Sequence, residues 1–157
     1  MVNLRIISIG KTKERWIQSG FDHYSKLLSK YARLEEDIVK AEKVLDESRG
    51  DSLLKKEGER IISRLRKDEP VVVLDQNGKL MSSEQLSEHL NKHFKSGKSR
   101  IDFVIGSALG VSEDVKAHAD LLLSFSRMTF PHELAKLMLT EQLYRAMSIL
   151  HGGKYHK

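Results

Sequence analysis

The stretch LLLSFSRMTFPHELAKLMLTEQLYRAMSILHGGKYHK, residues 121–157, decides the fold class of this chain. Its first residues, Leu121 to Phe125, form an apolar run that predicts a short buried strand, and a polar turn follows. Pro131 then stands at the start of an amphipathic helix, where its missing N–H costs nothing. Gly152-Gly153 end that helix after about Leu150. Because α/β proteins bind ligands in loops that follow buried strands, the polar turn is a candidate binding segment.

Further strands are expected upstream of this segment. Apolar runs of strand length lie at residues 4–9, 71–75 and 101–105, and a more polar run at 33–41 predicts a more exposed strand. The nearly all-apolar runs are typical of strands that are covered on both faces.

Helical spacing fills the intervals between the strands. Apolar residues recur every three or four positions from Thr12 to Tyr31, with Trp16 on the expected buried face. The same spacing predicts helices from Ser52 to Arg66 and from Ser83 to about Phe94, and a shorter helix is expected at 111–119. Thr12, Ser83 and Ser112 are the expected N-caps.

Two polar segments are expected to connect these elements. Residues 46–52 form a polar connection, and Asn77-Gly78 is a turn signal. Strands alternate with helices along the whole chain, which predicts an α/β fold: a mainly parallel sheet covered by helices on both faces.

Composition narrows the class of protein. The chain has 157 residues and no cysteine, so one domain spanning 1–157 is expected, with no disulfide and no cysteine-based metal site. No apolar run approaches the roughly 20 residues of a membrane helix, and the N-terminal run is too short for a signal peptide. We therefore expect a cytoplasmic protein without a membrane partner. The net charge of +5 is spread along the chain, which leaves open a polyanionic partner or an ordinary mixed surface.

His89 and His93 are a candidate metal-binding pair. They lie four residues apart on a predicted helix, but the metalloprotease pattern H-E-x-x-H needs a glutamate where this chain has Leu90. Solvated helix histidines are favoured, and no metal is expected.

Two loops could hold a polar ligand. Residues 106–110, GSALG, follow a buried strand but match neither the dinucleotide-binding nor the phosphate-binding glycine pattern. Residues 124–130, SFSRMTF, offer hydroxyls and backbone amides, while Met128 and Phe130 are suited to cover an adenine-like ring. An ordinary turn and an ordinary strand exit remain open for these two segments.

The last helix and the tail carry the remaining candidate groups. Glu141 and Arg145 either pair on the surface, four residues apart, or Arg145 has a functional role. The tail, residues 154–157, is either a frayed end or a set of aromatic and basic groups that contact RNA.

Several segments together resemble the RlmH-type methyltransferases of the SPOUT superfamily, which methylate ribosomal RNA of the large subunit. The resemblance covers essentially the whole chain. It rests on Ile9-Gly10-Lys11, Lys56 to Ile61, Leu74-Asp75, Gly78-Lys79, Phe103 to Gly106, Leu123 to His132, Glu141 to Ala146 and Tyr155-His156-Lys157.

The resemblance implies a fold, a cofactor and partners. It implies a C-terminal trefoil knot and a homodimer that acts on large-subunit ribosomal RNA within the assembled ribosome. The reaction would be S-adenosylmethionine-dependent methylation at the N3 position of a pseudouridine in a stem-loop. The cofactor would contact Leu74, Gly106, Phe125, Ser126, Arg127, Met128, Thr129 and Phe130.

The resemblance also implies catalytic groups. Arg145 would orient the base or offset its negative charge, and Tyr155 and His156 would complete the site. His156 is the more natural proton acceptor near neutral pH. One departure bears on the cofactor, because Ser107 stands where family members usually have a second glycine. An alternative is therefore a ribosome- or RNA-binding protein of the same fold with impaired catalysis. A small-molecule nucleotide-binding enzyme is a third reading, disfavoured by the missing glycine patterns.

Overall fold

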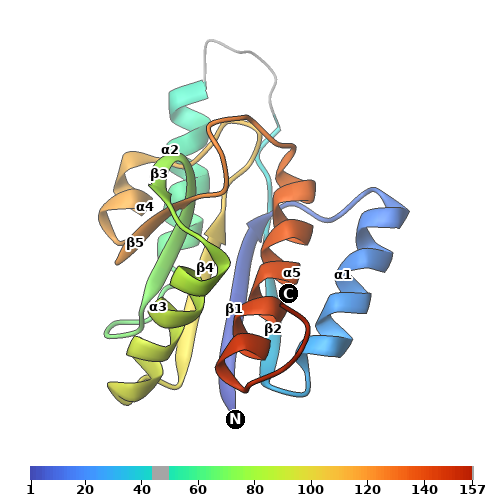
Figure 1. The fold of residues 1–157 in the computed structure, drawn as a ribbon. Helices are drawn as coiled ribbons and strands as arrows, with labels where there is room; N and C mark the ends of the chain where they lie inside the picture. The colour runs from blue at the N-terminus through green and yellow to red at the C-terminus, as the bar shows by residue number, and fades with distance from the viewer. Residues whose placement is uncertain (44–49, 157) are drawn as a thin grey trace.

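The computed structural model describes residues 1–43 and 50–156, so the connection expected at 46–52 falls largely outside the described residues. Strands and helices alternate along the described part of the chain, as predicted (Figure 1). The elements are β1 (Val2–Ile9), α1 (Arg15–Leu28), β2 (Ala32–Val39), α2 (Gly50–Ile62), β3 (Val71–Leu80), α3 (Ser83–Lys95), β4 (Arg100–Ile105), α4 (Glu113–Ala117), β5 (Leu121–Ser124) and α5 (His132–Leu150).

The strands form one parallel sheet in the order β2-β1-β4-β3-β5. Helices cover both faces: α1, α3 and α5 lie in front of the sheet in Figure 1, and α2 and α4 lie behind it. This arrangement confirms the predicted fold class. Among the described residues, no helix is both long and apolar enough to cross a membrane.

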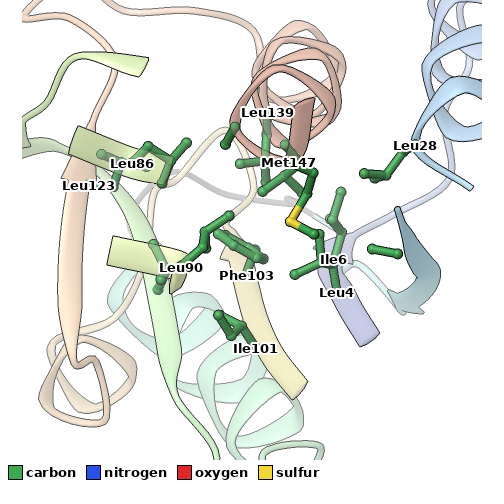
Figure 2. Packing of buried hydrophobic residues seen from close by; sticks show 14 of the residues in the cluster. Leu4, Ile6, Leu28, Leu86, Leu90, Ile101, Phe103, Leu123, Leu139 and Met147 are labelled. Carbon is green, nitrogen blue, oxygen red and sulfur yellow. The ribbon is translucent and has the colours of Figure 1, made fainter. Parts of the chain in front are cut away.

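Alternating side chains of the strands divide the core into two clusters. Leu4 and Ile6 of β1 face the larger cluster, and Ile7 and Ile9 face the smaller one on the other side of the sheet. Figure 2 shows Phe103 of β4 within the larger cluster, among side chains from α3 and α5. Both faces of the central strands are thus buried, which explains their nearly continuous apolar runs.

The helix starts differ in two places from the expected caps. Ser82, not Ser83, caps α3: its hydroxyl accepts from the Gln85 amide at 3.1 Å, and the Gln85 side chain accepts from the Ser82 amide at 2.8 Å. Thr12 does not cap α1, which begins after Glu14. Its hydroxyl instead lies 3.2 Å from the amino group of the buried Lys136. Ser112 caps α4 as expected.

The prediction of a connecting turn at Asn77-Gly78 is wrong, because these residues form a bulge within a strand. These residues lie inside β3, where Leu74 and Lys79 both align with Leu123 of β5. Residues 75–78 therefore bulge out of the ladder, and the strand resumes beyond them.

The expectation that Trp16 is buried is also wrong. Its side chain is 59% exposed, whereas Ile17, Phe21 and Leu28 form the buried face of α1. Trp16 lies in the first turn of α1, next to the start of the helix, and Ile17 takes the buried position.

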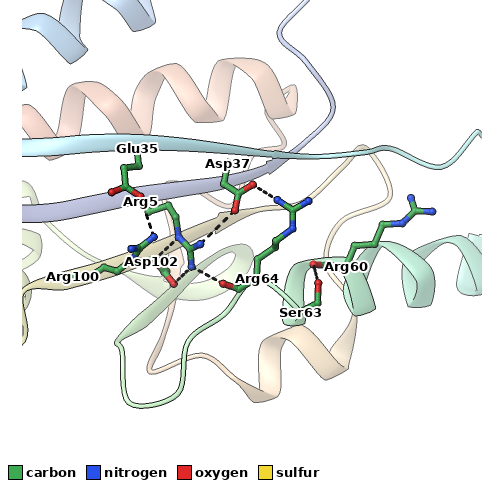
Figure 3. A network of polar contacts seen from close by, with 8 residues as sticks. All are labelled: Arg5, Glu35, Asp37, Arg60, Ser63, Arg64, Arg100 and Asp102. Atoms are coloured by element: carbon green, nitrogen blue, oxygen red, sulfur yellow. Dashed lines mark hydrogen bonds and ion pairs between the residues drawn. The ribbon is translucent and has the colours of Figure 1, made fainter.

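A buried ion-pair network joins three strands on the α2 side of the sheet (Figure 3). Asp102 of β4 is fully buried, and its two oxygens accept from Nε and Nη2 of Arg5 at 2.9 and 2.5 Å. Arg100 donates to Asp102 at 3.2 Å and to Glu35 of β2 at 3.1 Å. Arg5 also donates to the Arg64 carbonyl at 2.8 Å, which ties the turn after α2 to β1. The hydrogen bond with Asp102 raises the pKa of Arg5.

Replacing Asp102 should therefore destabilise the protein strongly. Asp102→Ala leaves two buried guanidinium groups short of their shared carboxylate, and we expect the free energy of unfolding in urea to fall by about 3–5 kcal/mol. Glu113→Ala is the control, because it removes a carboxylate that pairs with Lys116 at an exposed site. It should cost less than about 1 kcal/mol. Equal small losses in the two variants would contradict a structural role for the buried network.

Candidate active site

A cavity of about 730 Å³ opens beside the bulge of β3 and the carboxyl ends of β4 and β5. The β3 bulge, the 106–111 loop and the 125–132 segment form its walls. We call it the strand-end cavity. It contains seven of the eight residues expected to bind a cofactor, namely Leu74, Gly106, Phe125, Ser126, Met128, Thr129 and Phe130.

The lining combines apolar walls with a few polar groups. Leu74, Ile105, Leu123 and Phe125 supply apolar surface, and side chains such as Gln76, Ser126, Thr129 and His132 supply donors and acceptors. Small-molecule sites are typically of this size and character. The cavity is suited to a ligand that joins a flat apolar ring to a hydroxyl-bearing part.

Arg127 is the eighth expected residue, and its side chain does not line the cavity. Its Nη1 donates to the carbonyl oxygens of Gln76 and Gly78, at 2.6 and 3.3 Å. The Gln76 side chain in turn donates to the Arg127 carbonyl. Arg127 therefore holds the β3 bulge against the 125–130 segment and shapes the wall without contacting the cavity.

Gly106 is required by the turn that follows β4. A Cβ at this position would lie 2.2 Å from the carbonyl oxygen of Gly110, because the loop folds back on itself. The Gly110 amide donates to the Ser107 carbonyl at 2.9 Å, and Gly110 itself has a φ of +90°. Both glycines thus serve loop closure.

The three expected catalytic residues lie around Glu141, in the middle of α5: Arg145 and Tyr155 bind Glu141, and His156 contacts Arg145. We call these four residues the Glu141 cluster. The Oε1 atom of Glu141 accepts from Nη2 and Nε of Arg145, at 2.6 and 3.0 Å, and from the Tyr155 hydroxyl at 3.0 Å. The Arg145 guanidinium lies 4.6 Å from the centre of the Tyr155 ring. Figure 1 shows the chain turning back after α5 to reach these contacts, so the tail up to His156 is docked.

The contacts of His156 define its tautomer. Nη1 of Arg145 lies 3.3 Å from Nδ1 of His156, and the arginine can only donate. Nε2 of His156 lies 2.5 Å from Oε1 of Glu84, at the start of α3. A neutral imidazole with its proton on Nε2 satisfies both contacts, which places the lone pair on Nδ1, facing Arg145.

Tyr155 is held in its neutral form. Burial raises the pKa of the Tyr155 phenol far above its usual value, and Tyr24 and Glu141 nearby raise it further. The Tyr155 side chain also packs on Tyr144, with ring centres 4.5 Å apart. Tyr155 therefore acts as a hydrogen-bond donor to Glu141 across the neutral range.

Within one chain, the Glu141 cluster and the strand-end cavity are set apart along α5. Ala135 lines the cavity and Arg145 belongs to the cluster, ten residues later. At 1.5 Å per residue, that separation is about 15 Å. All residues from His132 to Leu150 are buried or half-buried, since α5 packs between α1 and α3.

Comparison with known proteins identifies the family. The family model described as "Predicted SPOUT methyltransferase" matches residues 2–156. The chain belongs to the SPOUT methyltransferase family. It is therefore an enzyme of the methyltransferase class.

Relatives of this SPOUT methyltransferase match it from end to end. "Ribosomal RNA large subunit methyltransferase H" of Shouchella clausii is 48% identical over 159 residues, covering 99% of this chain and 100% of the relative. The protein of the same name from Caldicellulosiruptor bescii is 44% identical, covering 98% and 99%. A solved structure, a probable methylase family protein from Haemophilus influenzae, has a TM-score of 0.54 at 16% identity and covers 98% of this chain and 70% of that one. This last likeness concerns the fold alone.

Two acidic residues that contact the expected catalytic groups were not predicted. Glu141 was expected only as a possible surface partner of Arg145. The four-residue spacing of these two residues indicated their ion pair but not the contact with Tyr155. Glu84 lies 72 residues from His156, and no local pattern points to it. Its own backbone amide and His156 lower the pKa of Glu84.

His89 and His93 lie apart from this site. Their rings are in edge contact, with centres 4.8 Å apart, and burial lowers the pKa of His89. Across residues 1–43 and 50–156, no group of three or more histidine, aspartate or glutamate side chains is placed to hold a metal ion.

The raised pKa of Tyr155 predicts a pH-dependent stability. The folded protein holds the phenol proton more tightly than the unfolded chain. The neutral phenol therefore contributes to the free energy of unfolding, and this contribution is complete below the ordinary pKa of about 10. It is lost as the pH rises from there towards the folded value. We expect the unfolding free energy of wild type to fall more steeply above about pH 10 than that of Tyr155→Phe, measured by urea titration. Parallel losses in the two proteins would contradict the assignment.

Proposed function

We propose that the chain methylates the N3 position of a pseudouridine in a stem-loop of large-subunit ribosomal RNA, with S-adenosylmethionine as the methyl donor and the assembled ribosome as the substrate. The family supports methyl transfer, and full-length relatives named as large-subunit ribosomal RNA methyltransferases support the class of substrate. The observation that carries the proposal is the strand-end cavity, formed by the segments that the sequence indicated.

The strand-end cavity is the proposed cofactor site. Its apolar walls suit an adenine ring, and its hydroxyl and amide groups suit a ribose and an amino-acid tail. When bound, S-adenosylmethionine supplies an activated methyl group whose leaving group needs no acid. The cavity therefore has to orient the donor and exclude water, for which its fixed loops are suited.

The Glu141 cluster is proposed to act on the base. N3 of the base must lose its proton as the bond to the methyl carbon forms. His156 carries a lone pair on Nδ1 and is the proposed proton acceptor, provided that Arg145 moves from it to the base. The Arg145 guanidinium then offsets the negative charge of the deprotonated ring. Tyr155, held neutral, orients Arg145 through Glu141.

A homodimer is proposed to bring the two parts together. Reacting atoms must approach within about 3.5 Å, whereas the cavity and the cluster of one chain are separated along α5. A two-fold axis next to α5 would place the tail of one copy at the cavity of the other. Further proposals of this reading are a single domain over residues 1–157, a trefoil knot around the 125–131 segment, and a cytoplasmic location with the ribosome.

The whole proposal is tested by mass spectrometry of ribosomal RNA. We expect one pseudouridine of the large subunit to carry the N3 methyl group in the parent strain, to lack it in a strain without the gene, and to regain it when the gene is restored. An unchanged modification pattern in the deletion strain would contradict the proposed substrate and favour a binding role.

Gly106→Val tests the cofactor site. A side chain at this position collides with the Gly110 carbonyl and distorts the 106–110 loop. We expect the affinity for S-adenosylmethionine, measured by calorimetry, to fall at least about tenfold, or roughly 1.4 kcal/mol. Gly50→Val is the control, because a Cβ there meets no atom within 4 Å. A folded Gly106→Val protein with unchanged affinity would remove this site assignment.

Deleting Tyr155, His156 and Lys157 tests the role of the tail. We expect methyl transfer to fall at least about a hundredfold, or roughly 2.7 kcal/mol, while cofactor binding changes little. The melting temperature should fall, because the contacts of Tyr155 with Glu141 and of His156 with Glu84 are lost. Arg145→Ala should behave similarly. Lys154→Ala is the control, because Lys154 is exposed and lies next to Tyr155 in the chain. It should keep near wild-type rates. The readout is labelled methyl transfer to purified ribosomes, and wild-type rates from the truncated protein would show that the tail is not part of the site.

A further inference from the structure

Glu57 is a buried carboxylate that the proposed chemistry does not use. It lies on α2, on the opposite face of the sheet from α5, and is 3% exposed. Its Oε1 accepts from the Ser107 hydroxyl at 2.7 Å, and its Oε2 accepts from the Glu42 amide at 3.3 Å. A buried carboxylate of this kind is costly unless its hydrogen bonds are made, so these partners are constrained to their positions.

Ser107 transmits this constraint to the strand-end cavity. Its hydroxyl donates to Glu57 and also accepts from the Leu109 amide at 3.2 Å. Its carbonyl accepts from the Gly110 amide at 2.9 Å. Ser107 therefore connects α2 to the backbone of Leu109 and Gly110. The loop that contains these residues forms a wall of the cavity.

The next residue of α2 fixes the other end of the same loop. A Cβ at Gly58 would lie 2.3 Å from the Ser112 hydroxyl, so α2 packs directly against the start of α4. Ser112 in turn caps α4 by accepting from the Val115 amide at 3.3 Å. Two adjacent residues of α2 therefore contact the two ends of the loop. Glu57 accepts a hydrogen bond at Ser107, and Gly58 packs closely against Ser112.

We propose that Glu57 is a positioning residue for the cofactor: through the Ser107 hydroxyl it sets the conformation of the 106–110 loop and so the affinity for S-adenosylmethionine. The inference rests on the proposed function for the identity of the ligand. Glu57 itself does not line the cavity, so its effect passes through Ser107. Removing the link should loosen the loop before the cofactor binds and leave the transfer step unchanged once it has bound.

Ser107→Ala is the primary test, because it deletes the link with the smallest change of volume. In the free protein, we expect faster amide hydrogen exchange in residues 107–110. Calorimetry should show an affinity for S-adenosylmethionine about fivefold weaker than wild type, as expected for one lost hydrogen bond. The KM for S-adenosylmethionine should rise by a similar factor, with kcat unchanged. Ser87→Ala is the matched control: it removes a buried serine hydroxyl that donates to the Ala146 carbonyl at 2.9 Å, away from the cavity.

Glu57→Met provides the second arm. The thioether has a similar length and is at most a weak acceptor, so both hydrogen bonds of the carboxylate are lost. If Glu57 acts through Ser107, the double variant should bind S-adenosylmethionine no more weakly than the weaker single variant. Additive losses would contradict action through Ser107.

The outcomes separate this inference from the proposed function. Wild-type affinity and wild-type exchange in Ser107→Ala would overturn the role of Glu57 and leave the cofactor site intact. An equal loss of affinity in Ser87→Ala would show that general destabilisation is the cause and would also overturn it. Wild-type protein that does not bind S-adenosylmethionine would contradict the proposed function and, with it, the cofactor role of Glu57.

Discussion

The parallel alignment of β3, β4 and β5 is the constraint on which the site depends. β4 and β5 end at the same edge of the sheet, where β3 bulges out of the ladder, so the segments that leave the ladder converge there. In this chain the β3 bulge, the 106–110 loop and the 125–131 segment meet around one cavity. The core fixes the positions of the strands at this edge, because the central strands are buried on both faces. The ion pairs of Asp102 also hold β4 against β1.

Three carboxylates each accept hydrogen bonds from side chains of other segments and so fix the positions of those side chains. Asp102 binds two guanidinium groups and fixes strand positions, Glu57 binds the Ser107 hydroxyl, and Glu141 binds Arg145 and Tyr155. Each holds its partners in one geometry, at a desolvation cost that the hydrogen bonds offset. Arg127 has a comparable role with backbone carbonyls as its partners. Much of the polar content around the cavity therefore serves to shape its walls.

Sequence patterns predicted the architecture because it follows from local rules. Apolar runs, helical spacing and glycine or proline stops identify strands and helices without knowledge of the fold. Errors arose where tertiary contacts override those rules. Thr12 faces Lys136 instead of capping a helix, and the Asn77-Gly78 signal became a bulge because β3 resumes its pairing with β5. Seven residues that line the cavity were named from the sequence. In contrast, the Gly78 and Gln76 partners of Arg127, the Glu57 partner of Ser107 and the Glu84 partner of His156 lie 49 to 72 residues away and leave no local signal.

The central claim is that the cavity of one copy works with the tail of another. Mixing two impaired proteins tests it directly. One is a Gly106→Val chain, whose weakened cavity is kept largely empty by assaying at a cofactor concentration well below its Kd, and the other is a chain truncated after Lys154, which lacks Tyr155, His156 and Lys157. After unfolding and joint refolding, half of the dimers should be mixed and each should hold one intact site, so methyl transfer to purified ribosomes should recover to about a quarter of wild type. Mixed dimers, verified by two different tags, that stay inactive would contradict a site shared between copies.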